Sequence, residues 1–444
     1  MTSTTDTTAP TNSTGGTAPV DTGATTGQTD EQARDRASLL PRLPAELTDH
    51  GKCPFDPPAG LTELSAEAPI HRVVTRDGDP AWLVTGHAAA RAVLADPRMS
   101  SDRMRRPGVL EKLSPAMRER VLDEKARAGG FIAMDAPEHT RYRKLLTGQF
   151  TVRRMRQLGP RINQIVTDHL DAVLAQGPPV DLVTAFALPV PSLVICELLG
   201  VPYADRAGFQ SWTAKLLTLG TPLEKLFEIG DQLRDFMLAL VADKRARPAD
   251  DLLSGLIQSG TEPALTDHEL VNIANLLLIA GHETTANMLA LGTFGLLDNP
   301  EQLAALRADP SGVEAAVEEL LRYLPIIHLG LMRHALADVE VGGQRIAEGD
   351  LVLVSIQAAN RDGAHYADPD ALDLTRARGP HLSFGHGIHQ CLGQQLARVE
   401  LAVGFTELLR RLPGLRLAVP QDEVPLREDM AIYGVHSLPV TWDV

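Results

Sequence analysis

Residues 384–393 read Phe384-Gly385-His386-Gly387-Ile388-His389-Gln390-Cys391-Leu392-Gly393 and are the most informative part of this 444-residue chain. Its three glycines, at 385, 387 and 393, permit positive φ and a close approach of the backbone to something flat or bulky. The apolar pattern after Cys391 predicts a helix to about Leu412. Cys391 therefore stands where a helix begins, and the free N–H groups and positive end of that helix would stabilise a thiolate.

The cysteine of this loop has more than one interpretation. A thiolate with an open face above it is what a haem iron needs for oxygen activation, because electron donation from sulfur favours O–O cleavage. A single buried cysteine is more often inert. A zinc site could use His381, His386, His389 and Cys391, although structural zinc loops do not usually need three glycines. A phosphate cradle does not fit, because no Gly-Lys-Ser/Thr ending follows. The loop alone favours haem, and the inert cysteine and the zinc site stay open.

A long helix carries the second informative motif. It begins with the capping box Thr266-Asp267-His268-Glu269 and its apolar pattern continues to about Leu297. The cluster Ala280-Gly281-His282-Glu283-Thr284-Thr285 lies in its middle, where a Gly costs about 1 kcal/mol relative to Ala. One interpretation is helix packing through small residues. The other is a local opening over the haem, in which Gly281 leaves room for a diatomic ligand and a Thr hydroxyl bonds its i−4 carbonyl.

With both motifs in place, the chain resembles the cytochrome P450 monooxygenases, specifically soluble bacterial members of actinobacterial type, from about residue 40 to the C-terminus. The resemblance implies a single large domain, mainly α with a minor β portion. It implies haem b (iron protoporphyrin IX) as cofactor, with Cys391 as the axial ligand of the iron and Phe384 beside its sulfur. It also implies that Ala280, Gly281 and Gly393 contact the haem.

The resemblance also assigns roles to charged and polar residues. It implies that Glu283 and Thr284 are a catalytic acid–alcohol pair that delivers protons to bound O2, with His282 structural and Thr285 in packing. Its propionate contacts would be four residues: His139, Arg143, Arg333 and His389. His139 and Arg143 are spaced i,i+4, on one face of a helix. A buried charged set, Glu319 with Arg322 and Arg376, would hold the cysteine loop, and such a set is costly unless fully paired.

Composition limits the classes of protein. Residues 1–36 are rich in Thr, Ser and Gly, without an aromatic residue, and predict a disordered tail before a haem-thiolate domain over 37–444. The net charge of −15 argues against nucleic acid as a partner. Three distant cysteines predict no disulfide framework. No apolar run approaches the roughly 18 residues that a bilayer requires, so we expect no membrane partner and a soluble, cytoplasmic protein.

Short strands are expected around these helices. The pattern predicts strands at Trp82–Thr85, Leu351–Ile356 and Ser437–Trp442, a hairpin over 338–346, and a further helix from about Val313 to Leu324 that stops before Pro325. The class is therefore mainly α.

The partners follow from the resemblance. A hydrophobic small molecule (a polyketide, terpenoid, steroid or xenobiotic) would be hydroxylated or epoxidised with O2. Its pocket would be lined by Ser100–Leu113, Leu277 and Ala280, Ile326–Leu329, and Ile432-Tyr433. Electrons would come from a ferredoxin and its ferredoxin reductase, and the ferredoxin would dock on a basic cluster: Arg141, Arg143, Lys144, Arg153, Arg154 and Arg156. Oxidative coupling or desaturation, and a non-enzymatic haem or ligand-binding protein, are the alternatives.

Overall fold

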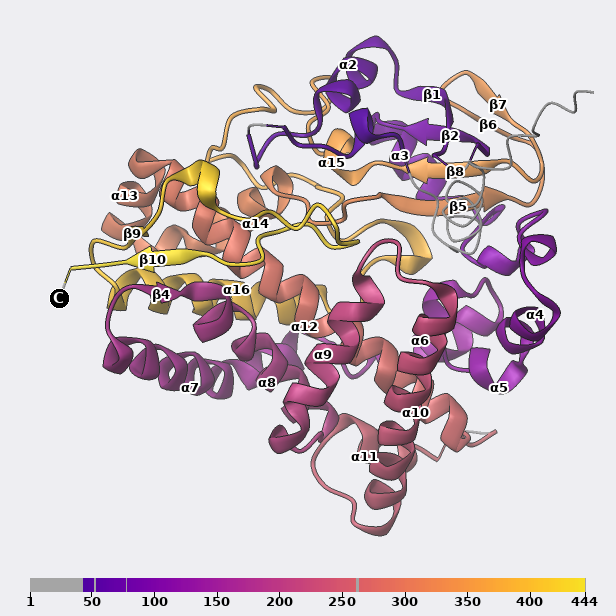
Figure 1. Cartoon of the computed structure of the whole chain (residues 1–444), viewed down its shortest axis with the longest axis horizontal. Coiled ribbons are helices and arrows are strands. Elements are labelled where there is room, and N and C mark those ends of the chain that lie inside the picture. The colour runs from indigo at the N-terminus through magenta and orange to yellow at the C-terminus, as the bar shows by residue number, and fades with distance from the viewer. Residues whose placement is uncertain (1–42, 52, 77, 261–262, 444) are drawn as a thin grey trace, which may run out of the picture.

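The computed structural model describes residues 43–51, 53–76, 78–260 and 263–443. The predicted tail, residues 1–36, and the first residues of the predicted domain, 37–42, lie outside this part of the chain. Helices form most of the molecule, and the largest sheet lies at one edge of it (Figure 1). The predicted class, mainly α with a minor β portion, is confirmed.

Fifteen α-helices occur in the described residues: α2 (Ala59–Glu67), α3 (His87–Ala95), α4 (Pro115–Leu122), α5 (Glu124–Arg127), α6 (Glu138–Thr147), α7 (Val152–Gln176), α8 (Pro189–Leu199), α9 (Arg206–Leu217), α10 (Leu223–Ala246), α11 (Leu252–Ile257), α12 (Asp267–Asp298), α13 (Pro300–Ala308), α14 (Val313–Tyr323), α15 (Ile356–Ala359) and α16 (Gln394–Arg411). Shorter 3₁₀ turns join them, among them η2 (Arg103–Arg105), η4 (Phe131–Ala133) and η8 (Gly387–His389), and η5 (Val183–Ala187) is a π turn.

The strands are short: β1 (Ile70–Val74), β2 (Pro80–Val84), β3 (Met99–Ser100), β4 (Val180–Asp181), β5 (Leu331–Ala335), β6 (Val339–Val341), β7 (Gln344–Ile346), β8 (Leu351–Val354), β9 (Arg416–Leu417) and β10 (Pro439–Thr441). The largest sheet has the order β1-β2-β8-β5-β3, a second has the order β4-β10-β9, and β6 pairs with β7. Strands β2 and β8 are parallel, with Ala81 opposite Leu351 and Val84 opposite Val354.

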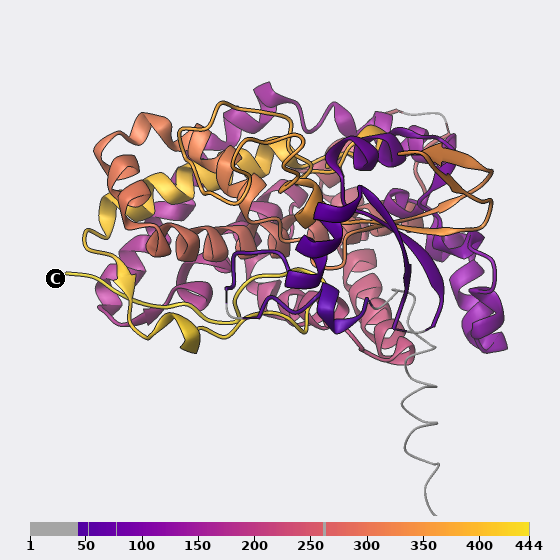
Figure 2. The same ribbon diagram turned by 90° about the horizontal axis from the view of Figure 1, so that it is seen from above.

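Helices cover both faces of the largest sheet. Side chains alternate along a strand, and Val84 and Val352 pack with α3 while Leu83 and Leu353 pack with α2. Strands β2 and β8 are consequently buried over nearly their whole length, as strands covered on both sides are. The sheet is thus a separate small layer beside the helical body (Figures 1 and 2).

Helix α12 is the centre of the helical body. It packs against α8, α10 and α16, and its residues are buried on all sides over most of its length. A helix that is apolar around its whole circumference has to be surrounded by other elements. Figure 2 shows α12 running through the interior between the helices of the two faces. Any polar side chain in its middle is therefore held in a buried environment.

The predicted elements are present, with ends that differ by one to three residues from the predicted ones, and one strand end is wrong. The capping box is confirmed, because Thr266 Oγ1 accepts the Glu269 N–H and Glu269 Oε2 accepts the Thr266 N–H. The helices α14 and α16, the hairpin β6–β7, and strands β2 and β10 occupy the predicted segments. The strand predicted to reach Ile356 is wrong at its end: β8 stops at Val354, and Ser355 caps α15 by accepting the Ala358 N–H at 3.2 Å.

Candidate functional site

The cysteine loop is a tight turn built on two of its glycines. Gly385 and Gly387 have φ of 68° and 74°, as predicted. A Cβ at Gly387 would lie 2.2 Å from the Leu94 carbonyl oxygen, so α3 approaches the loop closely. Gly393 differs from the prediction, because its φ is −83° and a Cβ there would meet open space. The Cys391 N–H donates to the Phe384 carbonyl at 2.8 Å and closes the loop just before α16.

Cys391 has an accessible surface, although protein atoms crowd its sulfur. This crowding raises the pKa of the thiol. The N–H groups of Gly393 and Gln394 and the charges of Arg143 and Arg398 act in the opposite direction and lower the pKa. The predicted help from the start of the helix is therefore present, and in the protein alone it does not outweigh burial.

Four predicted propionate contacts lie together beside this loop. The rings of His139 and His389 are 4.2 Å apart. Arg143 donates to the Gln390 carbonyl at 2.5 Å, and Arg333 is 8% exposed. Both ring nitrogens of His139 and Nε2 of His389 are buried and have no hydrogen-bond partner within the described residues.

Burial and mutual repulsion act on the pKa values of this cationic group. Burial lowers the pKa of Arg333 to about 10, and Arg103 contributes to this shift. Burial, with the charges of Arg333, His139 and Arg143, lowers the pKa of His389 to about 3. Unpaired buried nitrogens and crowded positive groups are costly. A flat group with two carboxylates would relieve both costs, so the residues present fit haem and its propionates.

Sequence reasoning missed two residues of this region. The negative charge of Asp135 acts to raise the pKa values of His139, His389 and Arg333. Its carboxylate accepts hydrogen bonds from the Ser100 hydroxyl at 2.5 Å and the Ser101 N–H at 2.9 Å. The second residue is Arg103 in η2, which has an exposed surface although the protein atoms around its guanidinium lower the pKa of that group. Only the short spacing of Asp135 before His139 could have indicated the acid.

The α12 cluster is continuous helix from Asp267 to Asp298, so the predicted opening is not a break in the helix. Thr284 Oγ1 donates to the Ala280 carbonyl at 2.6 Å, which is the expected i−4 bond. Ala280 is exposed and Thr284 is half-buried, in the middle of an otherwise buried helix. Gly281 supports the packing interpretation, because a Cβ there would lie 2.9 Å from Ile195 Cδ1 on α8. Its role beside a diatomic ligand stays a prediction.

Glu283 is one half of a buried ion pair. Its Oε2 lies 3.1 Å from Arg427 Nη2 and 3.3 Å from Asn287 Nδ2. Its Oε1 lies 3.7 Å from His282 Nε2, and the same nitrogen is 3.1 Å from Thr213 Oγ1. His282 is completely buried and also contacts the Leu278 carbonyl, which fits the structural role predicted for it.

In the part of the chain that the structure describes, Glu283 and Thr284 make no hydrogen bond to Cys391 or to the four predicted propionate contacts. Glu283 and Thr284 are carried by α12, and Cys391 by the loop before α16.

The predicted charged set is fully paired. Arg322 donates to Glu319 through Nε and Nη2, both at 2.8 Å, and Arg376 Nε donates to Glu319 Oε1 at 3.1 Å. Their remaining N–H groups donate to carbonyls of the irregular segment 360–371, including that of Pro369 at 2.7 Å. The set therefore fixes a segment that has little secondary structure of its own.

The predicted basic cluster is not one surface. Arg143 turns inward to Gln390, and Arg141 pairs with Glu269 at 2.5 Å. Arg154 donates to Gln149. The three exposed members are Lys144, Arg153 and Arg156.

Two of the predicted pocket segments do meet. Ile327 bridges Ile432, and the Tyr433 N–H donates to the Ile326 carbonyl at 2.8 Å. Tyr433 itself is buried, stacks on His50 at 4.0 Å between ring centroids, and donates its hydroxyl to the Pro54 carbonyl. Its observed contacts are therefore structural.

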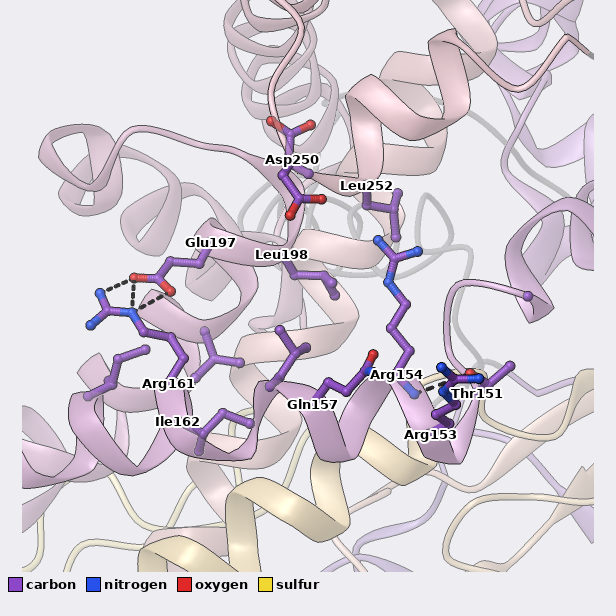
Figure 3. Close-up of a pocket in the computed structure, with 15 residues that line it drawn as sticks. Thr151, Arg153, Arg154, Gln157, Arg161, Ile162, Glu197, Leu198, Asp250 and Leu252 are labelled. Carbon is purple, nitrogen blue, oxygen red and sulfur yellow. Dashed lines mark hydrogen bonds and ion pairs between the residues drawn. The ribbon is translucent and has the colours of Figure 1, made fainter.

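A cavity of about 680 Å³ lies elsewhere, between the start of α7, the end of α8 and the start of α11 (Figure 3). Arg161 pairs with Glu197 at its wall, and Arg154 and Asp250 also line it. Arg153 and Arg154 of the predicted basic cluster line this cavity, but none of the predicted haem-binding or catalytic residues does. It is therefore not the place where the cysteine loop and the α12 cluster would work.

Two further observations bear on the alternatives. In residues 43–443, leaving out the masked positions, no three His, Cys, Asp or Glu side chains are grouped closely enough to hold a metal ion, which argues against the zinc site. In the same residues, no helix has both the length and the apolar character that crossing a membrane requires.

The chain matches known proteins over most of its length. The cytochrome P450 family model matches residues 79–313 and 311–440. Cytochrome P450 105C1 from a Streptomyces species is 51% identical over 388 residues, covering 87% of this chain and 96% of that protein. Pentalenic acid synthase from Streptomyces avermitilis is 49% identical over 400 residues, covering 90% and 98%. The crystal structure of CYP105P1 in complex with filipin I has a TM-score of 0.83 at 47% identity, covering 91% of this chain and 99% of that one.

Proposed function

This chain belongs to the cytochrome P450 family and is a haem-dependent monooxygenase, and we propose that it oxidises a hydrophobic small molecule with electrons from a ferredoxin. One oxygen atom of O2 enters a C–H bond or adds across a C=C bond of the substrate. The other leaves as water, which requires two electrons and two protons. The observation that carries the assignment of the site is the group beside Cys391 formed by His139 and His389, with buried ring nitrogens that have no partner among the described residues, the buried Arg333 and the half-buried Arg143.

The proposed roles follow from this arrangement. Haem, when bound through a thiolate, supplies the activation of O2. Cys391 would be the iron ligand, with Phe384 packed beside it and Gly393 leaving open space at the start of α16. His139, Arg143, Arg333 and His389 would hold the propionates. Ala280 and Gly281 would border the haem from α12.

Thr284 and Glu283 are proposed to deliver the protons. The Thr284 hydroxyl donates to the Ala280 carbonyl and keeps its oxygen lone pairs free to accept a hydrogen bond from water. The Glu283 carboxylate is the nearest acid along the helix, and Arg427 holds it in the interior. A positioned carboxylate and hydroxyl are suited to passing protons inward from solvent.

The substrate class is supported by the segments that meet near α12. Leu277 and the paired segments around Ile327 and Ile432 are mainly apolar, which suits a hydrophobic molecule. Two similar proteins point the same way: one is named pentalenic acid synthase, and the other has been crystallised with filipin I. We therefore propose a natural product of the polyketide, terpenoid or steroid kind, or a xenobiotic of similar polarity.

A ferredoxin, reduced by a ferredoxin reductase, is proposed as the electron donor. Lys144, Arg153 and Arg156 are exposed on α6 and α7, in a chain whose net charge is −15. Local basic charge on an acidic protein can steer an acidic partner to one face. Arg143 on the same helix reaches the Gln390 carbonyl beside Cys391, so this face adjoins the cysteine loop.

A difference spectrum tests the proposed ligand directly. Purified protein reduced with dithionite and exposed to carbon monoxide should show a red-shifted Soret band, which Cys391→Ala should lose. Cys53→Ala is the matched control, because Cys53 is half-buried and lies outside the loop. Retention of pigment and turnover in Cys391→Ala would overturn the proposal. Titration with apolar compounds, followed by displacement of iron-bound water in the spectrum, would then identify the substrate class.

A further inference from the structure

Helix α14 carries two adjacent glutamates with different partners. Glu319 holds Arg322 and Arg376, as described above. Glu318 points instead to α16, where Arg398 donates to it through Nε at 2.6 Å and through Nη2 at 3.1 Å. This bidentate contact fixes the plane of the guanidinium group. In the sequence Glu318 only precedes Glu319, and no local pattern links Glu318 with Arg398, which lies 80 positions later.

His381 is the second partner of Glu318. Its Nε2 lies 3.2 Å from Glu318 Oε2, and its Nδ1 accepts the Ser383 N–H at 3.2 Å. Because Nδ1 is an acceptor, the proton of the neutral ring is on Nε2 and is donated to the carboxylate. Burial raises the pKa of Glu318, but the hydrogen bonds from His381 and Arg398 outweigh it and lower the pKa to about 2. The carboxylate is therefore ionised at neutral pH.

Arg398 connects this acid to the cysteine loop. Its guanidinium carbon lies 4.5 Å from the centroid of the Phe384 ring, and the Phe384 carbonyl accepts the Cys391 N–H. Its Nη1 donates to Gln394 Oε1 at 3.0 Å. The guanidinium is thus held through its N–H groups by Glu318 and Gln394 and lies over the Phe384 ring. A flat cation on an aromatic ring is an attractive contact that restricts how the ring can turn.

The positive charge of Arg398 also acts on the environment of Cys391. The side chains of Arg398, Glu318 and His381 are 26%, 19% and 4% exposed, so water screens them only in part. Arg398 lies over Phe384, whose carbonyl accepts the Cys391 N–H, so its charge is held close to the residue that would ligate the iron. A positive charge near the bound iron favours the reduced state, which is more negative by one charge than the oxidised state. Glu318 lies behind Arg398 and offsets part of this effect.

We propose that Arg398 is a positioning residue that fixes the Phe384 ring beside Cys391, and that Arg398 and Glu318 together set the reduction potential of the bound haem iron. This inference rests on the proposed ligation of iron by Cys391. The two charges act with opposite signs, Arg398 raising the potential and Glu318 lowering it. A purely structural brace would predict no such opposition.

The test is potentiometry of the purified haem protein. Arg398→Gln removes the cation and should shift the ferric–ferrous equilibrium about tenfold toward ferric, which is about 59 mV for one electron. Glu318→Gln leaves the cation without its counter-charge and should shift the equilibrium toward ferrous by a similar factor. The double variant Glu318→Gln/Arg398→Gln should return to within about twofold of the wild type.

Two further variants are controls. Glu314→Gln is matched to Glu318→Gln, because Glu314 lies one turn earlier on the same face of α14 and pairs with Arg378 in an exposed contact at 3.2 Å. It should leave the potential unchanged. Arg398→Lys keeps the positive charge and loses the bidentate contact with Glu318. It should keep the potential near that of the wild type and broaden or split the Soret band of the carbon-monoxide complex, because Phe384 is less restrained.

Shifts of the same sign in Arg398→Gln and Glu318→Gln, or shifts no larger than that of Glu314→Gln, would overturn the inference. If Arg398→Gln does not yield folded haem protein, the comparison of Glu318→Gln with Glu314→Gln decides by itself. Absence of the red-shifted carbon-monoxide band in the wild type would refute the proposed ligand instead, so the two failures are distinguishable.

Discussion

The carboxylate of Glu283 lies 3.1 Å from the guanidinium of Arg427, and both side chains are at least 90% buried. Arg427 belongs to the hairpin over 426–435, where Leu426 bridges Val435 and the Arg427 N–H donates to the Gly434 carbonyl. A Cβ at Gly434 would lie 2.2 Å from Asn287 Oδ1, so this hairpin packs directly on α12. The proposed proton donor is therefore held by a segment that is remote from it in the sequence.

Removing Arg427 should leave a buried, uncompensated carboxylate. We expect Arg427→Met to lower the free energy of unfolding by about 3 kcal/mol, because breaking one side of a buried pair costs more than losing the pair. The double variant Glu283→Gln/Arg427→Met should recover at least half of this loss. Urea denaturation of the haem protein measures both values, and equal losses in the single and double variants would contradict the pairing.

Thr284 should matter through its hydroxyl group. We expect Thr284→Ala to lower the yield of oxidised product per electron pair by about 10²-fold, the lower end of what positioned proton transfer contributes. Thr284→Ser keeps the hydroxyl and should keep most of the yield. The measurement is product against consumed reductant, with peroxide release as the complement. Similar yields from the Ala and Ser variants would show that the hydroxyl has no part in proton delivery.

Gly281 should be a packing residue. Gly281→Ala places a Cβ 2.9 Å from Ile195 Cδ1, and overpacking of about 1–3 kcal/mol should exceed the helix gain of about 1 kcal/mol. The net result is a loss of stability. Ile195→Ala removes both Cδ1 and Cγ1, which would lie 2.9 and 3.1 Å from the new Cβ, so in that background Gly281→Ala should stabilise the protein. Gly230→Ala in α10 is the control, because its Cβ meets nothing within 4 Å and should simply stabilise the helix. Thermal unfolding of the wild type and of the four variants checks the reversal of sign.

Glu269 should contribute stability that depends on pH. Burial raises the pKa of Glu269, but hydrogen bonds from Arg141, Thr266 and Tyr142 lower it to about 2. Because the pKa is lower in the folded state, this stability is complete above the ordinary value of 4.5 and is lost as pH falls toward 2. Glu269→Gln should therefore cost about 2 kcal/mol at pH 6 and less at pH 3.5.

Thr151→Ala is the control for that measurement. Thr151 caps α7 by accepting the Arg154 N–H, and it makes no contact with Glu269, so the cost of its removal, about 1 kcal/mol, should be the same at both pH values. Urea denaturation at pH 6 and pH 3.5 compares the two variants. A cost of Glu269→Gln that stays constant between these pH values would contradict the lowered pKa.

The basic face should determine how fast the protein is reduced. Lys144→Glu and Arg156→Glu should each slow reduction by a ferredoxin about tenfold at low salt, and the effect should shrink as salt increases. Arg154 is a poorer choice because Gln149 already accepts from it. Arg76→Glu makes the same charge change at an exposed turn between β1 and β2, and should have little effect. Stopped-flow reduction measures the rates, with the ferric spectrum unchanged in all variants.

Much of the fold and part of the site could be predicted because the signals were local. The capping box at Thr266, the turn glycines 385 and 387, and the i−4 bond of Thr284 each depend on residues within a few positions of one another. The charged set of Glu319 could be predicted only from the resemblance to the family, since its third member is 57 residues away.

What could not be predicted depends on contacts between distant segments. Arg427 and Arg398 reach the site from other elements, and neither lies in a pattern that names its partner. Gly281 showed that a glycine in a helix has several uses, and only the position of Ile195 decides between them. The strand predicted to include Ile356 was wrong because Ser355, an ordinary strand residue by pattern, caps a helix instead.

Two arginines from outside the segment 360–371 hold much of its main chain, in addition to contacts of its own side chains such as Asn360 and Asp362. Arg322 and Arg376 donate to the main-chain carbonyls of Asn360, Ala367, Asp368, Pro369 and Ala371. Carbonyl groups are present whatever the side chain. Substitutions at exposed positions of this segment should therefore cost little stability. Replacing either guanidinium group should cost much more, because several main-chain carbonyls would lose their hydrogen-bond donor.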